Sequence, residues 1–188
     1  MFSRYQRNVD GNGAWLWEHQ ALTRARFVAG DPDLGRKFEA ERVSILREPR
    51  NRDALKVEVS AMRAKMLEGH SNASGLFDLK HDRGGMVDVE FIVQYLVLGW
   101  SADFPELVNN FGNILLLEMC ARLGLINEES AARTVLAYRR YRALQHEIRL
   151  NAGEGVPARV PLDMMEEERE AVKALWREVF GNDGPQRQ

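Results

Sequence analysis

The sequence predicts an all-α protein, a helical bundle of about seven helices with one irregular glycine-rich loop. Apolar side chains recur at intervals of three and four residues through most of the chain, which is the period of a helix packed on one face. Residues that cap or stop helices, mainly Asp, Asn, Gly and Pro, separate these periodic segments. Only the stretch from His70 to Gly85 lacks the helical period, and within it Phe77 to Lys80 alternates like a short extended piece.

Each periodic segment begins or ends at a residue that caps or stops helices. We expect helices over 14–29, from Asp31 or Asp33 to Pro49, from Asn51 or Asp53 to Gly69, over 86–100, from Asn109 or Asn110 to Gly124, from Asn127 to Leu150, and over 163–180. The segment 86–100 is apolar on nearly every side, so we expect it to be the central, buried helix. Asn127 is followed by two acids, and a capping side chain with acids in the first turn complements the helix dipole.

The amino-acid composition excludes several classes of protein. The 26 Lys and Arg and 28 Asp and Glu give a net charge of −2, without the basic excess typical of a general nucleic-acid binder. The longest apolar run, Phe91 to Leu98, is far shorter than the roughly 20 residues of a membrane span. The single cysteine, Cys120, cannot form an internal disulfide and is expected in the core. We therefore expect a cytoplasmic protein with no nucleic-acid or membrane partner.

The 188 residues, of which 45% are hydrophobic, are enough to form the core of one globular domain. We expect residues 14–181 to form this helical domain. A flexible segment is expected over 1–13 and a disordered tail over 182–188.

The segment from Asp78 to Phe91 is the most informative for function. Gly84 and Gly85 allow close backbone approach at the start of the central helix, where free N–H groups and the helix dipole favour an anion. Asp88 and Glu90 lie about 200° apart around that helix, so they cannot bind one metal ion from one face. Each is expected to meet a different cation, and the candidates are Lys80, Arg83, Arg24 and Arg26. A structural ion-pair network explains the same residues equally simply.

Three charged residues in the segment 14–29 are further candidates. Glu18 lies within the apolar stripe that is expected for this helix, so it is paired, protonated or turned to a cleft, and pairing with an arginine is as good an explanation as a binding role. Arg24 and Arg26 point to different sides of the expected helix, so at most one of them would hold a phosphate or carboxylate.

Other charged patterns have simpler explanations. Asp31-Pro32-Asp33 resembles the Asp-x-Asp magnesium pair of nucleotidyltransferases, but its place between two helices indicates capping. The arginines of the long helix, including Arg149, spread around it like a solvated face. The four histidines lack the spacing of a helical metal site, so we expect no metal in this chain.

Two separated motifs indicate a family. The run from Trp15 to Arg26, followed by Gly30-Asp31-Pro32, and the runs Asp78 to Lys80 and Gly84 to Tyr95 closely resemble the bifunctional glutamine synthetase adenylyltransferases. More narrowly, the chain resembles their C-terminal helical domain, which follows the second nucleotidyltransferase domain. The similarity extends through the long helix to Trp176.

The resemblance implies an enzyme that transfers AMP from ATP to a tyrosine of glutamine synthetase and removes it by phosphorolysis, and so controls nitrogen assimilation. It implies ATP and magnesium as cofactors of the intact enzyme, with regulation by glutamine and, through other domains, by the PII signal protein. The catalytic Asp-x-Asp domain is missing from this chain, so we expect no catalytic residue here and no bound cofactor. Its partners would be glutamine synthetase and the upstream nucleotidyltransferase domain.

Our hypothesis for the intact enzyme is a cleft wall that faces the nucleotide or the target tyrosine. Its residues are Glu18, Arg24, Arg26, Lys80, Gly84, Gly85, Asp88 and Glu90. The alternative is a non-catalytic docking module for glutamine synthetase or a regulatory domain. A broad exposed apolar patch beside the long helix would favour this alternative.

Overall fold

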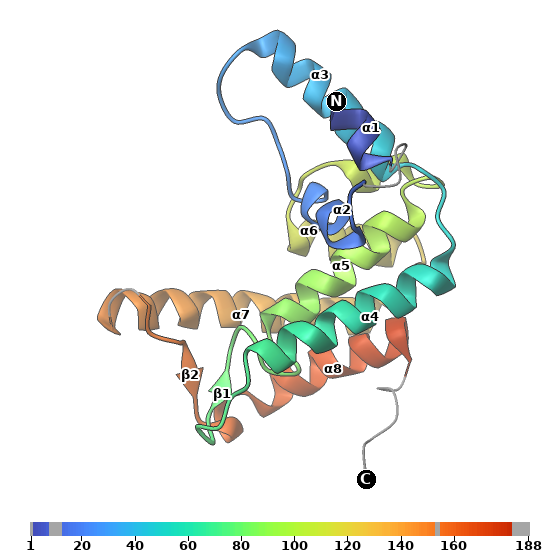
Figure 1. Ribbon diagram of the computed structural model, residues 1–188. Helices are drawn as coiled ribbons and strands as arrows, with labels where there is room; N and C mark the ends of the chain where they lie inside the picture. The colour runs from blue at the N-terminus through green and yellow to red at the C-terminus, as the bar shows by residue number, and fades with distance from the viewer. Residues whose placement is uncertain (1, 8–12, 153–154, 182–188) are drawn as a thin grey trace. The chain divides into compact units, whose positions relative to one another are not determined.

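The computed structural model confirms the all-α class (Figure 1), and it describes residues 2–7, 13–152 and 155–181. Within these residues the helices are α1 (Phe2–Gln6), α2 (Leu16–Leu22), α3 (Pro32–Leu46), α4 (Arg52–Gly69), α5 (Met86–Trp100), α6 (Asn113–Arg122), α7 (Glu128–Ala152) and α8 (Glu166–Phe180), with 3-10 turns at Pro105–Val108 and Leu162–Met165. The strands β1 (Phe77–Asp78) and β2 (Arg159–Val160) form one antiparallel pair. No helix in the described ranges has both the length and the apolar character to cross a membrane.

The chain divides into two compact units. One comprises Met1–Val59 and Gln94–Gly112, and the other comprises Ser60–Val93 and Asn113–Gln188. Helices α4 and α5 therefore contribute residues to both units. The boundaries expected for a flexible segment, a helical domain and a tail stay a prediction, since 1, 8–12, 153–154 and 182–188 lie outside the described residues.

In the first unit, two arginines, one buried and one half-buried, bind the carbonyl groups that helix ends leave open. Arg42 is 4% exposed and donates to the carbonyl of Val108 at 3.0 Å, while its Nε pairs with Glu39 at 2.7 Å. Arg50 donates to the carbonyls of Ile45 and Leu46 at 2.9 and 3.0 Å, at the end of α3. These last carbonyls of a helix have no partner within the helix, so a guanidinium is well suited to them.

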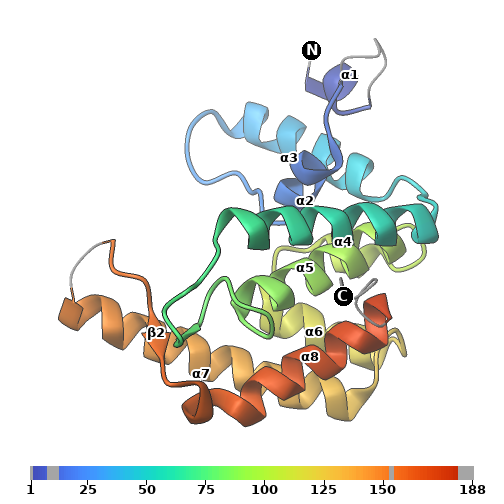
Figure 2. The same cartoon turned by 60° about the horizontal axis from the view of Figure 1, so that its bottom comes forward.

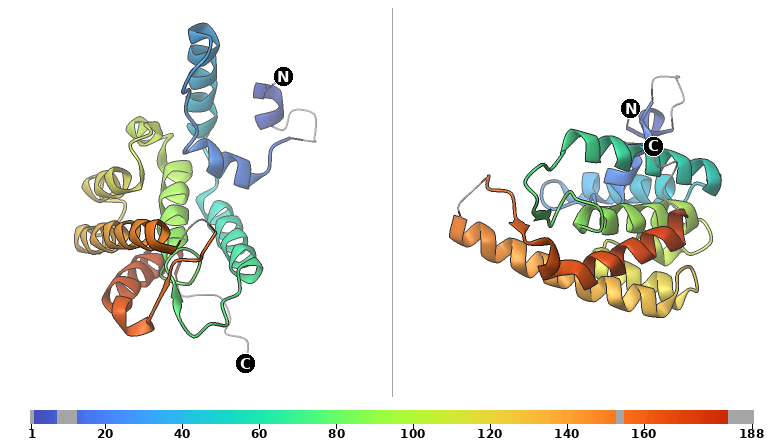
Figure 3. Two further views of the ribbon diagram at one scale, coloured as in Figure 1. Left: turned by 90° about the vertical axis from the view of Figure 1, so that its left-hand side faces the viewer. Right: turned by 90° about the horizontal axis from the view of Figure 1, so that it is seen from below.

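In the second unit, α7 packs against both α6 and α8, and Figures 2 and 3 show α7 and α8 side by side. These three helices carry many residues that are fully or almost fully buried. They include Leu116, Leu117, Cys120, Tyr141, Val172 and Leu175. Burial raises the pKa of Cys120 to about 12, as expected of a thiol in an apolar core.

Two predicted helix starts are confirmed by their caps. Asp31 accepts hydrogen bonds from the backbone N–H groups of Asp33 and Leu34 and begins α3, with Pro32 in the first turn. Asn127 accepts from the N–H groups of Glu129 and Ser130 at 2.9 and 3.1 Å and begins α7. The central helix α5 has the predicted bounds, 86–100.

The helix predicted over 14–29 is wrong beyond Leu22. Its last turn ends where the Thr23 hydroxyl donates to the Gln20 carbonyl at 2.7 Å. Backbone bonds to Ala21 continue through the N–H groups of Arg24 and Ala25. Side chains distant in sequence then take over: Glu39 accepts from the N–H of Phe27, and Asn110 donates to the carbonyl of Arg24. These backbone groups have hydrogen-bond partners although the helix does not continue, so tertiary contacts override the local sequence pattern.

The apolar stripe predicted for this helix, which includes Trp17, Ala21 and Leu22, is confirmed only in part. Leu22 is buried, but Trp17 is 51% exposed, Ala21 is exposed, and the polar Gln20 is buried instead. Gln20 is satisfied in that position because its side-chain amide donates to Gln94 of α5 at 3.0 Å.

Three further elements differ from the prediction. The short helix α1 at Phe2–Gln6 was not expected, because five residues carry too little pattern. Strand β2 was not expected either, since two residues gain their extended form only from pairing with β1. Helix α6 begins at Asn113 and not at Asn109 or Asn110, because the 3-10 turn Pro105–Val108 and an extended Asn109 precede it.

We predict that Leu117→Ala lowers the free energy of unfolding by about 2 to 5 kcal/mol, because it removes a fully buried side chain from the face of α6 that packs on α7. Equilibrium urea denaturation of the 188-residue chain measures this loss. The matched control is Leu115→Ala on the same helix, where the side chain is 48% exposed and the change should be small. Equal losses for the two variants would contradict this packing.

Candidate functional site

The irregular stretch between α4 and α5 is held in place by a distant part of the chain. Phe77 pairs with Val160 and Asp78 with Arg159 in the β1–β2 ribbon. The pairing extends by one bond, from the N–H of Leu79 to the carbonyl of Ala158 at 3.0 Å. The loop that carries the sequence motif is therefore fixed at its centre by residues that follow α7.

A buried ion pair anchors the other end of this loop. Arg63 of α4 is fully buried, and its Nε donates to Oδ1 of Asp88 at 2.6 Å. One terminal nitrogen of Arg63 also donates to the carbonyl of His81 at 2.7 Å, and Oδ2 of Asp88 accepts from the N–H of Gly84 at 2.6 Å. Two side chains thus connect α4, the loop and the first turn of α5.

The cation that pairs directly with Asp88 is Arg63, which is not among the four proposed cations. Of those four, Arg83 also attracts the Asp88 carboxylate, but its effect on the pKa of Asp88 is smaller than that of Arg63. Arg63 lies four residues after Val59, on the buried face of α4. An arginine within an apolar stripe is the sequence signal that could have indicated this buried ion pair. Burial raises the pKa of Asp88, and the Arg63 guanidinium and the Gly84 N–H act in the opposite direction.

The glycine pair serves packing within the protein. Gly84 has a φ of +84°, and a Cβ there would lie 2.8 Å from the carbonyl oxygen of Arg169 in α8. Its own carbonyl accepts from the hydroxyl of Tyr141 at 2.9 Å. At Gly85 a Cβ would lie 2.9 Å from the carbonyl oxygens of Leu79 and Asp82. Only glycine allows these close backbone approaches.

The N–H groups at the start of α5 have partners inside the loop. Those of Gly85, Met86 and Val87 donate to the carbonyls of Asp82, Leu79 and Lys80, at 2.9, 2.9 and 3.1 Å. With the N–H of Gly84 bonded to Asp88, this helix start does not offer the free donors expected for an anion.

Glu90 is half-buried and accepts from the hydroxyl of Tyr138 at 3.3 Å. The partner is again not the cation that the sequence analysis expected. The Tyr138 hydroxyl in turn accepts from the side-chain amide of Asn113 at 2.8 Å, so Glu90 belongs to a small polar network against α6 and α7.

The other predicted residues lie in the first unit. Glu18 pairs with no arginine among the described residues but accepts from the hydroxyl of Tyr5 at 2.8 Å and from the N–H of Trp15 at 2.8 Å, where it closes the first turn of α2. Arg24 and Arg26 are exposed and follow the end of α2, so the helical geometry assumed for them does not apply.

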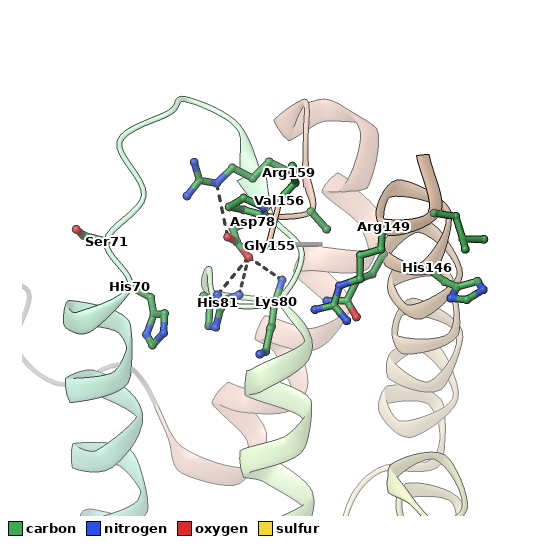
Figure 4. A pocket seen from close by; sticks show the side chains of 14 residues that line it. His70, Ser71, Asp78, Lys80, His81, His146, Arg149, Gly155, Val156 and Arg159 are labelled. Atoms are coloured by element: carbon green, nitrogen blue, oxygen red, sulfur yellow. Dashed lines mark hydrogen bonds and ion pairs between the residues drawn. The ribbon is translucent and has the colours of Figure 1, made fainter. Parts of the chain in front are cut away.

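Lys80 opens onto a cavity of about 940 Å³, which we call the basic pocket (Figure 4). It lies among the end of α4, the loop after β1, the end of α7 and the segment before β2. Its lining residues are His70, Ser71, Asp78, Lys80, His81, Gln145, His146, Arg149, Leu150, Gly155, Val156, Pro157, Ala158 and Arg159. Figure 4 shows Arg149 extending from α7 in the direction of Lys80 and Asp78.

Asp78 organises this pocket. It is 5% exposed, and its Oδ1 accepts from the N–H groups of Lys80 and His81 at 2.9 and 3.0 Å. Its Oδ2 lies 3.6 Å from Nε of Arg159. The carboxylate therefore fixes the turn that carries Lys80 and neutralises one of the three cations that line the cavity.

Two imidazoles stack at one side of the pocket. The rings of His70 and His81 lie 4.1 Å apart with an interplanar angle of 12°. Burial lowers the pKa of His81 from its ordinary value of 6.5, and the neighbouring cations Lys80 and Arg63 lower it further, against the attraction of Asp78.

The sequence pattern indicates Lys80 but not the assembly of this pocket. The spread of arginines around the long helix favours a solvated face for Arg149, and the spacing of the histidines bears only on metal binding. Distant segments bring these residues together, and no local spacing predicts that. No group of three or more His, Cys, Asp or Glu side chains in the described ranges is placed to hold a metal ion.

Two family models match the chain. One, described as GlnD PII-uridylyltransferase, matches residues 54–176, and the other, described as Glutamate-ammonia ligase adenylyltransferase, matches residues 1–41. The first match covers α5 and most of the second unit, and it includes both Lys80 and Arg149.

Several curated relatives share the printed name bifunctional glutamine synthetase adenylyltransferase/adenylyl-removing enzyme. The chain is 55% identical to that of Ralstonia nicotianae, over 96% of this chain and 19% of the relative. It is 54% identical to that of Burkholderia mallei and 50% identical to that of Nitrosomonas eutropha, in each case over 96% of this chain and 20% of the relative. These matches confirm the resemblance indicated by the motifs, and the chain spans about a fifth of the length of these relatives.

We predict that Asp88→Asn lowers the free energy of unfolding by about 3 to 5 kcal/mol, because it leaves the buried Arg63 guanidinium without its counter-charge. Urea denaturation of the 188-residue chain tests this. Asp163→Asn, which removes an exposed carboxylate, is the control and should change little. A variant of Asp88 as stable as the parent chain would show that the pair does not anchor the loop.

We predict that His81 titrates below 6.5 in the folded chain, as followed by the NMR shifts of its ring protons. Since the unfolded state then binds a proton at a higher pH than the folded state, this residue lowers the free energy of unfolding as the pH falls below 6.5. The same residue in the urea-unfolded chain is the control and should titrate near the ordinary value. A folded midpoint above the unfolded one would contradict the burial described here.

Proposed function

Because the chain belongs to the family described by the GlnD PII-uridylyltransferase model, and shares half or more of its residues with bifunctional glutamine synthetase adenylyltransferases, we propose that it is a helical domain of such an enzyme. The enzyme would transfer AMP from ATP to a tyrosine of glutamine synthetase and remove it by phosphorolysis, and so control nitrogen assimilation. The observation that carries this proposal is the 55% identity over 96% of the chain to a relative whose name states both activities.

We further propose that the chemistry belongs to a nucleotidyltransferase domain outside this chain, which would bind ATP and magnesium. The one Asp-x-Asp of this chain supports this division of labour. Asp31 is occupied as the cap of α3, and Asp33 pairs with Arg36 on the helix surface. Both carboxylates therefore have a structural role. In this proposal PII would act through other domains, and glutamine synthetase would be the substrate.

The loop that begins α5 would form one wall of the cleft in the intact enzyme. Its residues divide into two roles. Gly84, Gly85 and Asp88 are buried and bonded within the protein, so they would position the loop. Lys80 is exposed at the surface of the same turn, and its ammonium group suits the phosphates of a nucleotide. Glu90 would hold the adjacent face through Tyr138. For Glu18, Arg24 and Arg26 the binding role stays a separate prediction.

The docking alternative would need a broad apolar surface beside α7. Leu136 and Leu150 of this helix are 65% and 73% exposed. They lie fourteen positions apart in the sequence, which is roughly 21 Å along a helix, so the two do not make one patch. Isolated exposed leucines are common on protein surfaces and do not favour docking over the cleft.

We predict that Lys80→Met in the full-length enzyme lowers kcat for AMP transfer about tenfold or more, because it removes a cation that faces the reactants, with no change in the unfolding temperature. Transfer of radiolabelled AMP to glutamine synthetase measures the rate. The control is Lys65→Met, which removes the same charge from the exposed side of α4.

Unchanged kcat in the Lys80 variant would remove this residue from the cleft. The 188-residue chain without the rest of the enzyme is expected to incorporate no AMP into glutamine synthetase. Robust incorporation by this chain would refute the proposed division of labour.

A further inference from the structure

The charges that line the basic pocket are not balanced. Lys80, Arg149 and Arg159 line the cavity, and among the described lining residues Asp78 is the one carboxylate. Asp78 already accepts two backbone N–H groups and lies 3.6 Å from Arg159. Neither Lys80 nor Arg149 forms an ion pair with any of the described residues. Two cations therefore line one concavity without a counter-charge from the part of the chain that the structure describes.

Such an arrangement favours an anion. Like charges that share a hollow with low-dielectric walls repel one another, and the field between them attracts negative charge more strongly than a flat surface would. A guanidinium and an ammonium group together bind phosphate oxygens well, the first through a planar fork and the second as a compact point charge.

The remaining walls suit a larger body than a bare ion. The stacked rings of His70 and His81 form one side, and Leu150 and Val156 are exposed apolar side chains at the edge. A volume of about 940 Å³ is at the upper end of small-molecule sites, which are roughly 300 to 1,000 Å³. Flat imidazoles and apolar side chains beside cations match a ring attached to a phosphate.

We propose that the basic pocket binds an organic phosphate of nucleotide size, with the phosphate between Arg149 and Lys80 and the ring system against the histidine stack. This inference rests on the second unit alone. The pocket shares Lys80 with the proposed cleft wall, whereas Gly84, Gly85, Asp88 and Glu90 do not line it, so the inference does not require the chain to form that wall.

Titration of the 188-residue chain tests the proposal. The probes are AMP, which carries one phosphate on a purine nucleoside, adenosine, inorganic phosphate and a short polyglutamate peptide, all with EDTA present. Calorimetry gives Kd, and amide NMR shifts locate the site. We expect AMP to bind at least tenfold more tightly than inorganic phosphate, with shifts at Lys80, Arg149 and Arg159, and adenosine to show no detectable binding.

A matched pair of variants connects the affinity to the pocket. Arg149→Gln should weaken AMP binding at least tenfold with an unchanged circular dichroism spectrum. Arg142→Gln makes the same charge change on the same helix outside the pocket and should leave Kd unchanged. Because Arg149 has no part in the proposed cleft, failure here and failure of the Lys80 variant in AMP transfer are distinguishable.

Four results would overturn the proposal. Adenosine binding as tightly as AMP would remove the role of the phosphate, and equal affinity for AMP and inorganic phosphate would remove the role of the ring. If polyglutamate binds more tightly than AMP and AMP does not displace it, the pocket would instead be a binding site for an acidic protein segment. Equal weakening by the two arginine variants would overturn it as well, because the attraction would then come from net charge and not from the pocket.

Discussion

The buried pair of Arg63 and Asp88 is the interaction on which the rest of the second unit depends. Burying two charges is unfavourable unless each also gains hydrogen bonds, and here the Gly84 N–H and the His81 carbonyl supply them. The pair fixes where α5 begins relative to α4. It thereby fixes the turn that brings Gly84 against α8 and leaves Lys80 at the surface. The most polar contact of the interior therefore sets the geometry of the candidate site.

Local signals were enough to predict much of the fold. The bounds of α5 follow from a continuous apolar run and the start of α7 from the Asn127 cap, because both features act within a few residues. The end of α2 could not be predicted, since Glu39 and Asn110 satisfy the backbone that follows it. Nor could β2, which is extended only because it pairs with β1.

The same distinction between local and long-range interactions applies to the candidate site. The motif around Lys80 and Asp88 is contiguous and was found from spacing alone. Arg149, Arg159 and the histidines reach the same cavity from separate segments, and their approach depends on the ribbon and on the packing of α7. A sequence shows which residues can bind an anion, but the assembly of three cations around one hollow is a property of the tertiary structure.

The ribbon has a consequence for how the protein is made. Helices α4 and α5 can form as soon as they leave the ribosome, but β1 must wait until β2 has been synthesised. At about 5 to 20 residues per second, this interval is roughly 4 to 16 s, far longer than the microseconds of helix formation. During that time Phe77, which is fully buried in the finished fold, has no strand to pair with. The candidate site is therefore among the last parts of the chain to become native, and nascent chains stalled before residue 159 would expose it to chaperones and proteases.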